Sequence, residues 1–530
     1  MKYYFLSCLF FLLGISINEI QAQTYISKQL LYSSTGNLND NEDEEFNTVI
    51  QLNDNGYLAA GTQSNNGVEA GLYDFLVSKV NNNLELEWSY VFDNDEIDIA
   101  HALIETNEGE YIVVGSSGYR LVSSEVLTDV WIIKLDSEGS LIWQKTYGGS
   151  ESDFGLEILT LENEEYMIAG YTNSTDGDIS NAFGGDDAWL FKIDTDGNLL
   201  WEKTIGGEAD DKANDIAYDA DNQQFILVGA TASIETQGGQ DFWIAALDME
   251  GNISWEVAYG GPNLDSAKDV VLDEEGNIYV LGSTLLQGGD VSITFGNGDF
   301  WLIKLDNNGE LLWEKTVGAA SFDIPNSLIK DNNGDILIIG STFDPSVAPP
   351  NYFYDVRIAR INNNNSELIW DTNIGGSQWD FGNTIILNNE GKYVVAGFSD
   401  SSDGDVGGIG HAAEVAARHG ADNAWLFELV DINVNVGIGI NAINTNEFTI
   451  SIYGNILNNK LLLNVKEISN KKLNIVLYNT NGQKIFQESH LSSDFNDLLT
   501  IELPTLASNI YYLQINDGTY FFTEKIIIQR

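Results

Sequence analysis

The 530-residue sequence has a single cysteine, Cys8, which lies in an apolar segment at the N-terminus. We expect that segment to be removed on export, so the mature chain would carry no thiol. Disulfides, cysteine–metal sites and thiol nucleophiles are then excluded. Stability has to come from the packing of side chains.

Basic residues are scarce: 24 stand against 80 acidic residues, which gives a formal net charge of −56. The excess is uneven, because residues 447–530 are nearly neutral and the acids concentrate before them. A surface of this sign repels nucleic acid and anionic lipid. Two interpretations stay open, a solvated acidic surface suited to a salty exterior and a dedicated cation-binding surface, and the first is favoured.

The sequence has no apolar run long enough to span a membrane. Its start, "MKYYFLSCLFFLLGISINEIQAQ", reads as a secretory signal, with Lys2 as the charged end and Ala22 before the cleavage point. We therefore predict a signal peptide over residues 1–22. No helical periodicity of useful length, no glycine-rich phosphate loop and no G-x-S-x-G motif is present.

A unit of 54 to 58 residues recurs along the chain, marked by the tryptophans Trp88, Trp143, Trp201, Trp255, Trp313 and Trp370. A fixed period of this size indicates a solenoid or a propeller. Each unit has four strand-like runs, and "DVWIIKLD" (129–136) alternates between two faces with the period of a β-strand. Four antiparallel strands per repeat predict the blade of a β-propeller.

The third and fourth runs of a unit are joined by turns such as "LDSEGSL", "IDTDGNL" and "LDNNGEL". Glycine supplies the positive φ that a short hairpin loop needs, and the aspartate three residues earlier can accept hydrogen bonds from the turn amides. "DTDGN" (194–198) is also similar to part of a calcium loop, but it lacks the later acidic ligands of an EF-hand, so a turn is favoured.

The units are incomplete at the end, because seven second strands are matched by only six Trp-bearing fourth strands. The segment "KQLLYSSTGN" (28–37) supplies the missing strand if Tyr32 takes the Trp position. An N-terminal strand that completes the last blade closes the ring and leaves no open sheet edge. The sequence therefore predicts an all-β fold with a seven-bladed propeller over residues 24–432.

Two acids recur along the units, one before each first strand and one before the third-strand Trp position, where the seventh unit has Asn423 instead. They could form a ring of carboxylates around an axial channel, or they could accept hydrogen bonds from backbone amides between strands. Their presence in every unit favours the structural role, because catalysis breaks symmetry. Trp379 is the one tryptophan outside the repeated positions, and Leu76 and Arg357 replace the third-strand Trp in two units. Such breaks in the pattern are where function is expected.

The variable loops between second and third strands include "TDGDIS" (175–180) and "SDGDVG" (402–407). Binding residues are often carried on such loops. Carboxylate oxygens suit Ca²⁺, so Asp176, Asp178, Asp403 and Asp405 are candidate calcium ligands, with an acidic turn as the favoured alternative.

The repeat, with motifs such as D-x-W-[IL]-x-K-[IL]-D, resembles secreted Bacteroidota propeller proteins of unassigned activity. It is also distantly similar to quinoprotein propellers through "ALDMEGNISW" (246–255), and groups of this kind are sometimes linked to endoglucanases. In the tail, "LNIVLYNTNGQKIFQES" (473–489) and "LPTLASNIYYLQINDG" (503–518) resemble the type A C-terminal sorting domain of the type IX secretion system. That resemblance implies a small seven-stranded β-sandwich and handling by the type IX machinery, although the usual Pro-Asn-Pro is replaced by "YGNIL" (453–457).

Together these features predict a signal peptide (1–22), a propeller (24–432), a linker (433–446) and a sorting domain (447–530). The expected role is a secreted or cell-surface module that binds a glycan or a surface protein, with no nucleic-acid partner and no transmembrane segment. The alternative is a carbohydrate-active, endoglucanase-like hydrolase built on the propeller. No catalytic residue and no cofactor other than a possible Ca²⁺ is assigned.

Overall fold

In the computed structural model of the chain, the described residues are 24–32, 43–64, 73–94, 97–120, 126–161, 164–234, 236–320, 322–343, 353–401, 406 and 422–431, together with the C-terminal strands. Contacts between residues divide the chain into two compact units, one of which is Thr24–Asp431. The predicted signal peptide and the predicted linker lie outside the described residues.

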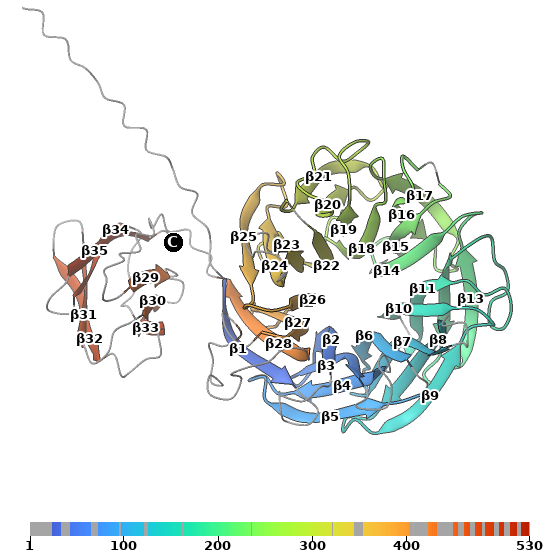
Figure 1. Ribbon diagram of the computed structural model, residues 1–530, viewed down its shortest axis with the longest axis horizontal. Coiled ribbons are helices and arrows are strands. Elements are labelled where there is room, and N and C mark those ends of the chain that lie inside the picture. The colour runs from blue at the N-terminus through green and yellow to red at the C-terminus, as the bar shows by residue number, and fades with distance from the viewer. Residues whose placement is uncertain are drawn as a thin grey trace, which may run out of the picture. The chain divides into compact units, whose positions relative to one another are not determined.

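Strands of four kinds make up the Thr24–Asp431 unit, named by their distance from the centre of the ring in Figure 1. The innermost strands are β2 (Glu44–Gln51), β6 (Ile97–Glu105), β10 (Asp153–Thr160), β14 (Asp211–Asp219), β18 (Ser266–Leu272), β22 (Asp323–Lys330) and β26 (Asp380–Leu387). The second strands are β3 (Tyr57–Ser64), β7 (Tyr111–Arg120), β11 (Tyr166–Thr172), β15 (Gln224–Thr231), β19 (Ile278–Thr284), β23 (Ile336–Phe343) and β27 (Tyr393–Ser399). The third strands are β4 (Tyr73–Val80), β8 (Val126–Leu135), β12 (Asp187–Ile193), β16 (Asp241–Leu247), β20 (Asp299–Leu305), β24 (Tyr354–Ile361) and β28 (Asn423–Asp431). The outermost strands are β5 (Leu86–Phe92), β9 (Leu141–Tyr147), β13 (Leu199–Ile205), β17 (Ile253–Tyr259), β21 (Leu311–Val317), β25 (Leu368–Ile374) and β1 (Thr24–Tyr32).

These strands form four-stranded antiparallel sheets that follow one another around the ring (Figure 1). Separate sheets have the orders β10-β11-β12-β13, β14-β15-β16-β17, β18-β19-β20-β21, β22-β23-β24-β25 and β1-β28-β27-β26. Strands β2 to β9 form an eight-stranded sheet, in which β4 and β6 are joined by one parallel pair, Tyr73 and Ile97. We call each sheet, and each half of the eight-stranded sheet, a four-stranded unit.

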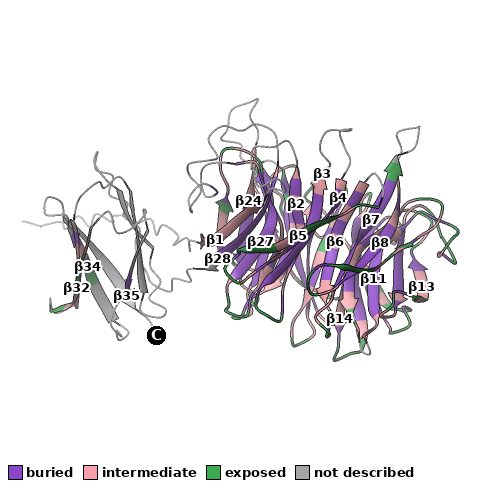
Figure 2. Cartoon of the chain, turned by 90° about the horizontal axis from the view of Figure 1, so that it is seen from below, coloured by how far each residue is buried: buried purple, intermediate pink, exposed green. Residues whose placement is uncertain are grey.

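The core lies between neighbouring four-stranded units. Second and third strands are buried on both faces, as in β16 and β20, where every residue is buried (Figure 2). Such strands read as continuous apolar runs because each face packs on a neighbouring unit. The outermost strands are more exposed, and β5 has no buried residue. Each innermost strand also carries a register shift against its second strand, for example between Gly155 and Glu157.

The tryptophan of the third strand is the largest side chain in this core. Trp131, Trp189, Trp243, Trp301 and Trp425 are all among the fully buried residues. The indole nitrogen of Trp189 donates to Glu202 on the neighbouring strand, 3.3 Å away, and Trp243 and Trp301 do the same with Glu256 and Glu314. A buried indole N–H needs such a partner, which explains the acidic residue after the fourth-strand tryptophan.

The tryptophan of the outermost strand packs on the hairpin turn of the next unit. Gly197 has a φ of +73°, and a Cβ added to it would lie 3.0 Å from the ring of Trp143. The Trp143 indole also donates to the Thr195 carbonyl in the same turn, at 3.2 Å. Glycine is therefore required twice, for the left-handed backbone and for the close approach of the ring. The same pairing joins Trp88 to Gly139, Trp201 to Gly251 and Trp255 to Gly309.

The predicted closure by the N-terminal strand is confirmed. Strand β1 pairs antiparallel with β28, and Leu31 lies opposite Trp425. The prediction that Tyr32 takes the tryptophan position is wrong. Tyr32 pairs with Ala424, and the equivalent pair in another unit is Ile205 with Ala188. Tyr32 resembles the tryptophans only in being aromatic, whereas hydrogen bonds along the whole strand set the pairing register.

Lys28 takes the tryptophan position instead. It lies opposite Glu428, as Trp201 lies opposite Lys192, and its ammonium group donates to the Asn82 carbonyl at 2.9 Å. That carbonyl belongs to the turn of the next unit, so Lys28 makes the bond that the Trp143 indole makes elsewhere. The adjacent Gln29 accepts from the Trp425 indole at 3.0 Å, in the place of Glu202.

The C-terminal strands form two antiparallel sheets. One has the order β29-β30-β33, from Thr449–Tyr453, Lys460–Lys466 and Leu498–Glu502. The other has the order β32-β31-β34-β35, from Lys484–Leu491, Lys472–Asn479, Asn509–Asn516 and Phe521–Ile528. Leu473, Ile475 and Leu477 are buried on one face of β31. Within the part of the chain that the structure describes, no helix has the length and apolarity to cross a membrane.

Candidate functional site

The acid that begins each innermost strand is a structural residue. Asp153 is fully buried and accepts the backbone N–H of Gly149 at 2.7 Å and the hydroxyls of Thr172 and Ser174. The same bond to the amide four residues earlier is made by Asp98, Asp211, Asp265, Asp323 and Asp380. Each carboxylate fixes the connection that enters its strand, so the structural role predicted for these acids is confirmed.

The acid before the third-strand tryptophan caps a loop in the same way. Asp187 accepts the amide of Phe183 at 2.7 Å, and Asp299 accepts that of Phe295 at 2.8 Å. At three junctions this acid and the innermost-strand acid of the next unit both border one glycine, which is Gly148, Gly206 or Gly375. A Cβ on Gly148 would lie 2.5 Å from Asp153 Oδ2 and 2.6 Å from Asp129 Oδ1. The glycine leaves room for two carboxylates.

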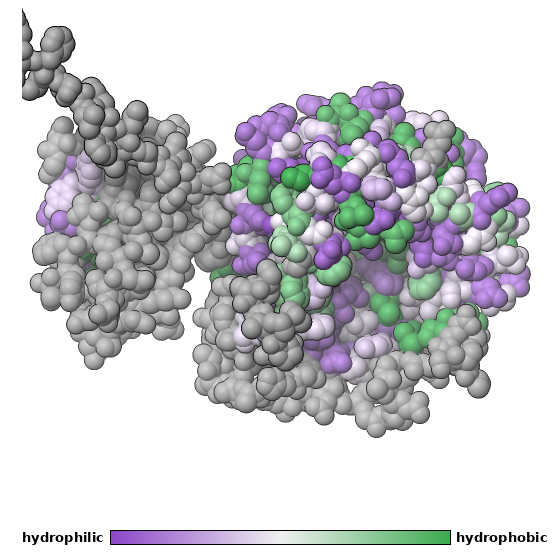
Figure 3. Space-filling model, turned by 45° about the horizontal axis from the view of Figure 1, so that its top comes forward, coloured by the Kyte–Doolittle hydropathy of each residue, from purple (hydrophilic) through white to green (hydrophobic). Residues whose placement is uncertain are grey.

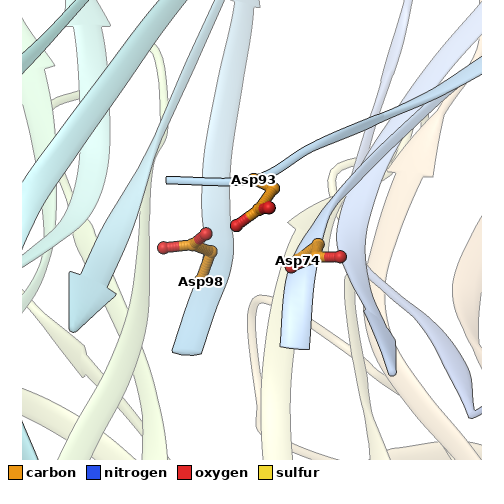
Figure 4. A group of neighbouring side chains, drawn as sticks. All are labelled: Asp74, Asp93 and Asp98. Carbon is orange, nitrogen blue, oxygen red and sulfur yellow. The ribbon is translucent and has the colours of Figure 1, made fainter. Parts of the chain in front are cut away.

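Asp93 breaks this pattern, because it occupies the position that is Gly148 in the next unit. Its carboxylate joins those of Asp74 and Asp98, and oxygen atoms of the three lie within 4.8 Å of one another (Figure 4). Burial, with the charges of Asp93 and Asp98, raises the pKa of Asp74 to about 6. Three converging carboxylates have the donor chemistry that a hard divalent cation prefers.

The calcium candidates from the sequence lie elsewhere. Asp176 Oδ1 accepts the amide of Ser150 at 2.8 Å, and Asp178 Oδ2 accepts that of Gly148 at 3.1 Å. Both carboxylates therefore order the loop between β11 and β12, and the group that gathers three carboxylates among the described residues does not include them. Asp403 and Asp405 lie outside the described residues.

A cavity of about 330 Å³ opens where the last four-stranded unit meets the first two. It is lined by Asp43, Glu44, Glu45, Asn47, Thr62, Tyr73, Ile99, His101 and Asp422. Glu45 follows the first residue of β2 and Asp422 directly precedes β28, so the closure of the ring brings them together. Asn383 on β26 donates to Glu45 Oε1 at 2.8 Å.

Burial controls the ionisation of this cavity. It raises the pKa of Asp422 to about 7, together with the nearby charges of Asp43, Asp400 and Glu45. Burial also raises the pKa of Glu45 and lowers that of His101 to about 4. Among the described residues that line the cavity there is no lysine or arginine, and a neutral histidine supplies no positive charge. This described lining is therefore acidic.

An aromatic cluster lies on the last four-stranded unit, which also borders the cavity, and on the unit before it. The rings of Phe381 and Phe398 stack at 4.7 Å with an angle of 12°, and Tyr354 lies 5.1 Å from Phe381. Trp379 is 6.1 Å from both Tyr354 and Phe381, and 45% of it is exposed. We call Tyr354, Trp379, Phe381 and Phe398 the aromatic ledge.

Two contacts connect the aromatic ledge to the cavity. Asn383, which bonds Glu45, follows Phe381 on β26, and β2 packs against both β26 and β27. The amide of Asp400 donates to the Trp379 carbonyl at 2.8 Å, while the Asp400 charge acts on Asp422. Figure 3 shows that hydrophobic residues form separate patches on a largely hydrophilic surface, so an exposed aromatic group is a local feature.

Sequence reasoning singled out Trp379 but missed the cavity. Glu45 and Asp422 are far apart in the chain, and neither belongs to a motif. The signal that could have found them is the predicted closure, because it places both residues beside the junction of the first and last units.

Sequence reasoning also missed three acids on successive innermost strands, Glu157, Asp215 and Asp269. Burial raises the pKa of Glu157 to about 8. Asp215 and Asp269 each accept an amide from the next unit, so they also join neighbouring units.

Residues 451–529 match the family described as the secretion system C-terminal sorting domain. This match identifies a type IX sorting signal and confirms the resemblance seen in the tail. A stretch of 226 residues, 38% of the chain, is 25% identical to the regulatory protein FlaEY of Caulobacter vibrioides. The matched stretch spans 23% of that protein.

Two solved structures match the chain at low sequence identity. The WD40 domain of Pan2 from Neurospora crassa is 12% identical, with a TM-score of 0.44 over 77% of this chain and 96% of that one. An exo-β-1,3-galactanase from Phanerochaete chrysosporium is 11% identical, with a TM-score of 0.32 over 81% of this chain and 95% of that one.

Proposed function

We propose that the protein is a glycan-binding module with a seven-bladed propeller, a signal peptide over residues 1–22 and a C-terminal β-sandwich that serves as the export address. The count of seven follows if the eight-stranded sheet is two blades joined at Tyr73 and Ile97. The boundaries proposed are 24–432 for the propeller, 433–446 for a linker and 447–530 for the sorting domain.

The observation that carries the binding role is the aromatic ledge beside an acidic cavity. An exposed indole offers a flat apolar face on which a sugar ring can stack, and a cavity with several oxygen acceptors can bond its hydroxyls. The ledge also departs from the repeat, whose other tryptophans serve packing.

The binding role is tested by a glycan array on the purified chain, followed by titration calorimetry on each hit. Trp379→Ala should weaken binding by about tenfold or more, because stacking contributes 1–2 kcal/mol. Phe183→Ala is the matched control, since Phe183 is also exposed (53%) but is not part of the aromatic ledge. A glycan whose affinity falls equally in both variants would contradict the aromatic ledge as the binding surface.

Hydrolysis is the second candidate, and the cavity's carboxylates favour it. A protonated Asp422 near Glu45 is the kind of pair that a general acid and a base or nucleophile would form. Reducing ends released from each bound glycan, measured with wild type and with Glu45→Gln, separate the two functions. Turnover that Glu45→Gln abolishes supports the hydrolase; saturable binding without products supports the module.

Export by the type IX machinery is expected to deliver the propeller to the cell surface or the medium. Deleting residues 451–530 should leave the protein in the periplasm, as measured by fractionation and by protease accessibility on intact cells. Surface display of the truncated chain would contradict this route.

Calcium binding at Asp176 and Asp178 stays a prediction. Calorimetry with CaCl₂ on wild type and on Asp176→Asn tests it.

A further inference from the structure

We propose that the cavity takes a positively charged amine, so that the preferred ligand is an unacetylated amino-sugar chain of the glucosamine type. This inference rests on the proposed glycan binding and names the class of glycan. Glu45, Asp43 and Asp422 line the cavity, and no lysine or arginine is among the described residues that line it. An ammonium group would supply the missing opposite charge.

The contacts of the carboxylates show why a cation fits. Asp43 accepts the amide of Asp422 at 3.2 Å, and Glu45 accepts the neutral side-chain amide of Asn383 at 2.8 Å. These partners order the side chains without neutralising them. Like charges that converge at a half-buried site repel one another, and a bound cation relieves that repulsion. A neutral sugar offers no such gain.

The remainder of the ligand is identified by the surface beside the cavity. The main chain of the aromatic ledge is joined to Asp400, whose amide donates to the Trp379 carbonyl and whose charge acts on Asp422. A pyranose ring on the ledge with an amine directed into the cavity uses both features at once. The chain's net charge of −56 disfavours a uronic-acid or sulfated glycan over the same surface.

Titration calorimetry with the full chain compares three probes: the β-1,4-linked glucosamine tetramer, its N-acetylated counterpart and tetralysine. The two sugars share ring and linkage and differ in charge. We expect the glucosamine tetramer to bind at least about tenfold more tightly than the acetylated one, which is the worth of one favourable charge contact. Glu45→Gln and Asp422→Asn should each remove most of that preference, with unchanged melting temperature as the check on folding.

Asp93→Asn is the control, because it removes the same charge from the other acidic cluster. It should leave the preference for the glucosamine tetramer intact. Equal binding of both sugars would overturn the amine inference and leave glycan binding standing. Tetralysine binding with the same response to Glu45→Gln would show a cationic peptide site and overturn the sugar class. Absence of binding by every sugar would overturn the proposed function as well.

Discussion

The junctions between neighbouring four-stranded units are of two kinds. At the junctions that follow β5, β9, β13, β17 and β21, the outermost-strand tryptophan contacts the turn of the next unit, as Trp143 contacts Gly197. Where the last unit meets the first, Lys28 takes the tryptophan position and reaches the equivalent carbonyl, that of Asn82. The bond to the turn is common to both kinds, whereas the tryptophan is not.

This difference shows that closure depends on backbone pairing more than on side-chain packing. The pairing of β1 with β28 runs along the whole strand, from Thr24 to Tyr32. A strand held by that many hydrogen bonds tolerates a lysine at a position where other junctions use tryptophan. The acidic cavity lies at the same junction, where the repeat is least regular.

The largest effect is expected from removing β1. A chain that lacks residues 24–32 exposes the edge of β28 and the apolar face around Tyr32, which packs on Phe46. We expect the melting temperature to fall by more than about 10 °C, since several kcal/mol of pairing and burial are lost. An unchanged melting temperature, measured by differential scanning calorimetry, would refute closure by this strand.

Next in size is the loss of a third-strand tryptophan. Trp189→Ala removes a fully buried indole that bonds Glu202. It should lower the free energy of unfolding by about 3–5 kcal/mol, because it leaves a cavity and removes the hydrogen bond to Glu202. Urea unfolding measures the change. A loss under about 1 kcal/mol would show that the core repacks freely around this position.

The tryptophan–glycine contact can be isolated with a matched pair. Gly197 and Gly109 have similar φ values, +73° and +77°, but an added Cβ at Gly109 meets nothing within 4 Å. Both alanine variants carry the backbone strain, of about 1 kcal/mol, and only Gly197→Ala also displaces Trp143. We expect the Gly197 variant to be less stable by roughly a further 1–2 kcal/mol. Equal losses would mean that the ring moves aside without cost.

A pH-dependent effect is expected at the carboxylate cluster around Asp93. Because the folded-state pKa of Asp74 is raised to about 6 from 3.8, the folded chain binds the proton more tightly than the unfolded chain. Ionisation of Asp74 therefore lowers stability as pH rises from about 4 to 6, and the loss is complete above that range.

Asp93→Asn removes one of the repelling charges. In buffer with EDTA it should stabilise the protein at pH 7 by about 0.5–1 kcal/mol and change little at pH 4, where Asp74 is mostly protonated. Thermal unfolding at the two pH values checks this. A destabilisation at pH 7 would show that the carboxylate makes a contact more important than the repulsion.

The smallest effect is expected at Lys28. Lys28→Ala removes the bond to Asn82 and a 3.9 Å ion pair with Glu428, on a side chain that is 32% exposed. Partly exposed contacts of this kind contribute about 0.2–1 kcal/mol. Chemical unfolding should therefore show a far smaller loss than for Trp189→Ala. A loss of similar size would mean that the closing junction depends on this side chain.

Much of the ring could be predicted from local patterns. Alternation identified the strands, the glycine of each turn identified the hairpins, and the unmatched fourth strand identified the closure by residues near the N-terminus. The register of that closure was not predictable from one aromatic residue, so Tyr32 was misplaced and Lys28 was overlooked. Local similarity between two short segments is a weak guide when one of them has lost the tryptophan.

The candidate site was less predictable, for a physical reason. The sequence by itself determined the repeat, the strands, the turns and the sorting tail, since these depend on residues close together in the chain. Only the folding of the chain in three dimensions brings Glu45 and Asp422 into one cavity and crowds Asp93 against Asp74. Burial and the charges of neighbours through space set the chemistry of a carboxylate, and neither is written in the residues next to it.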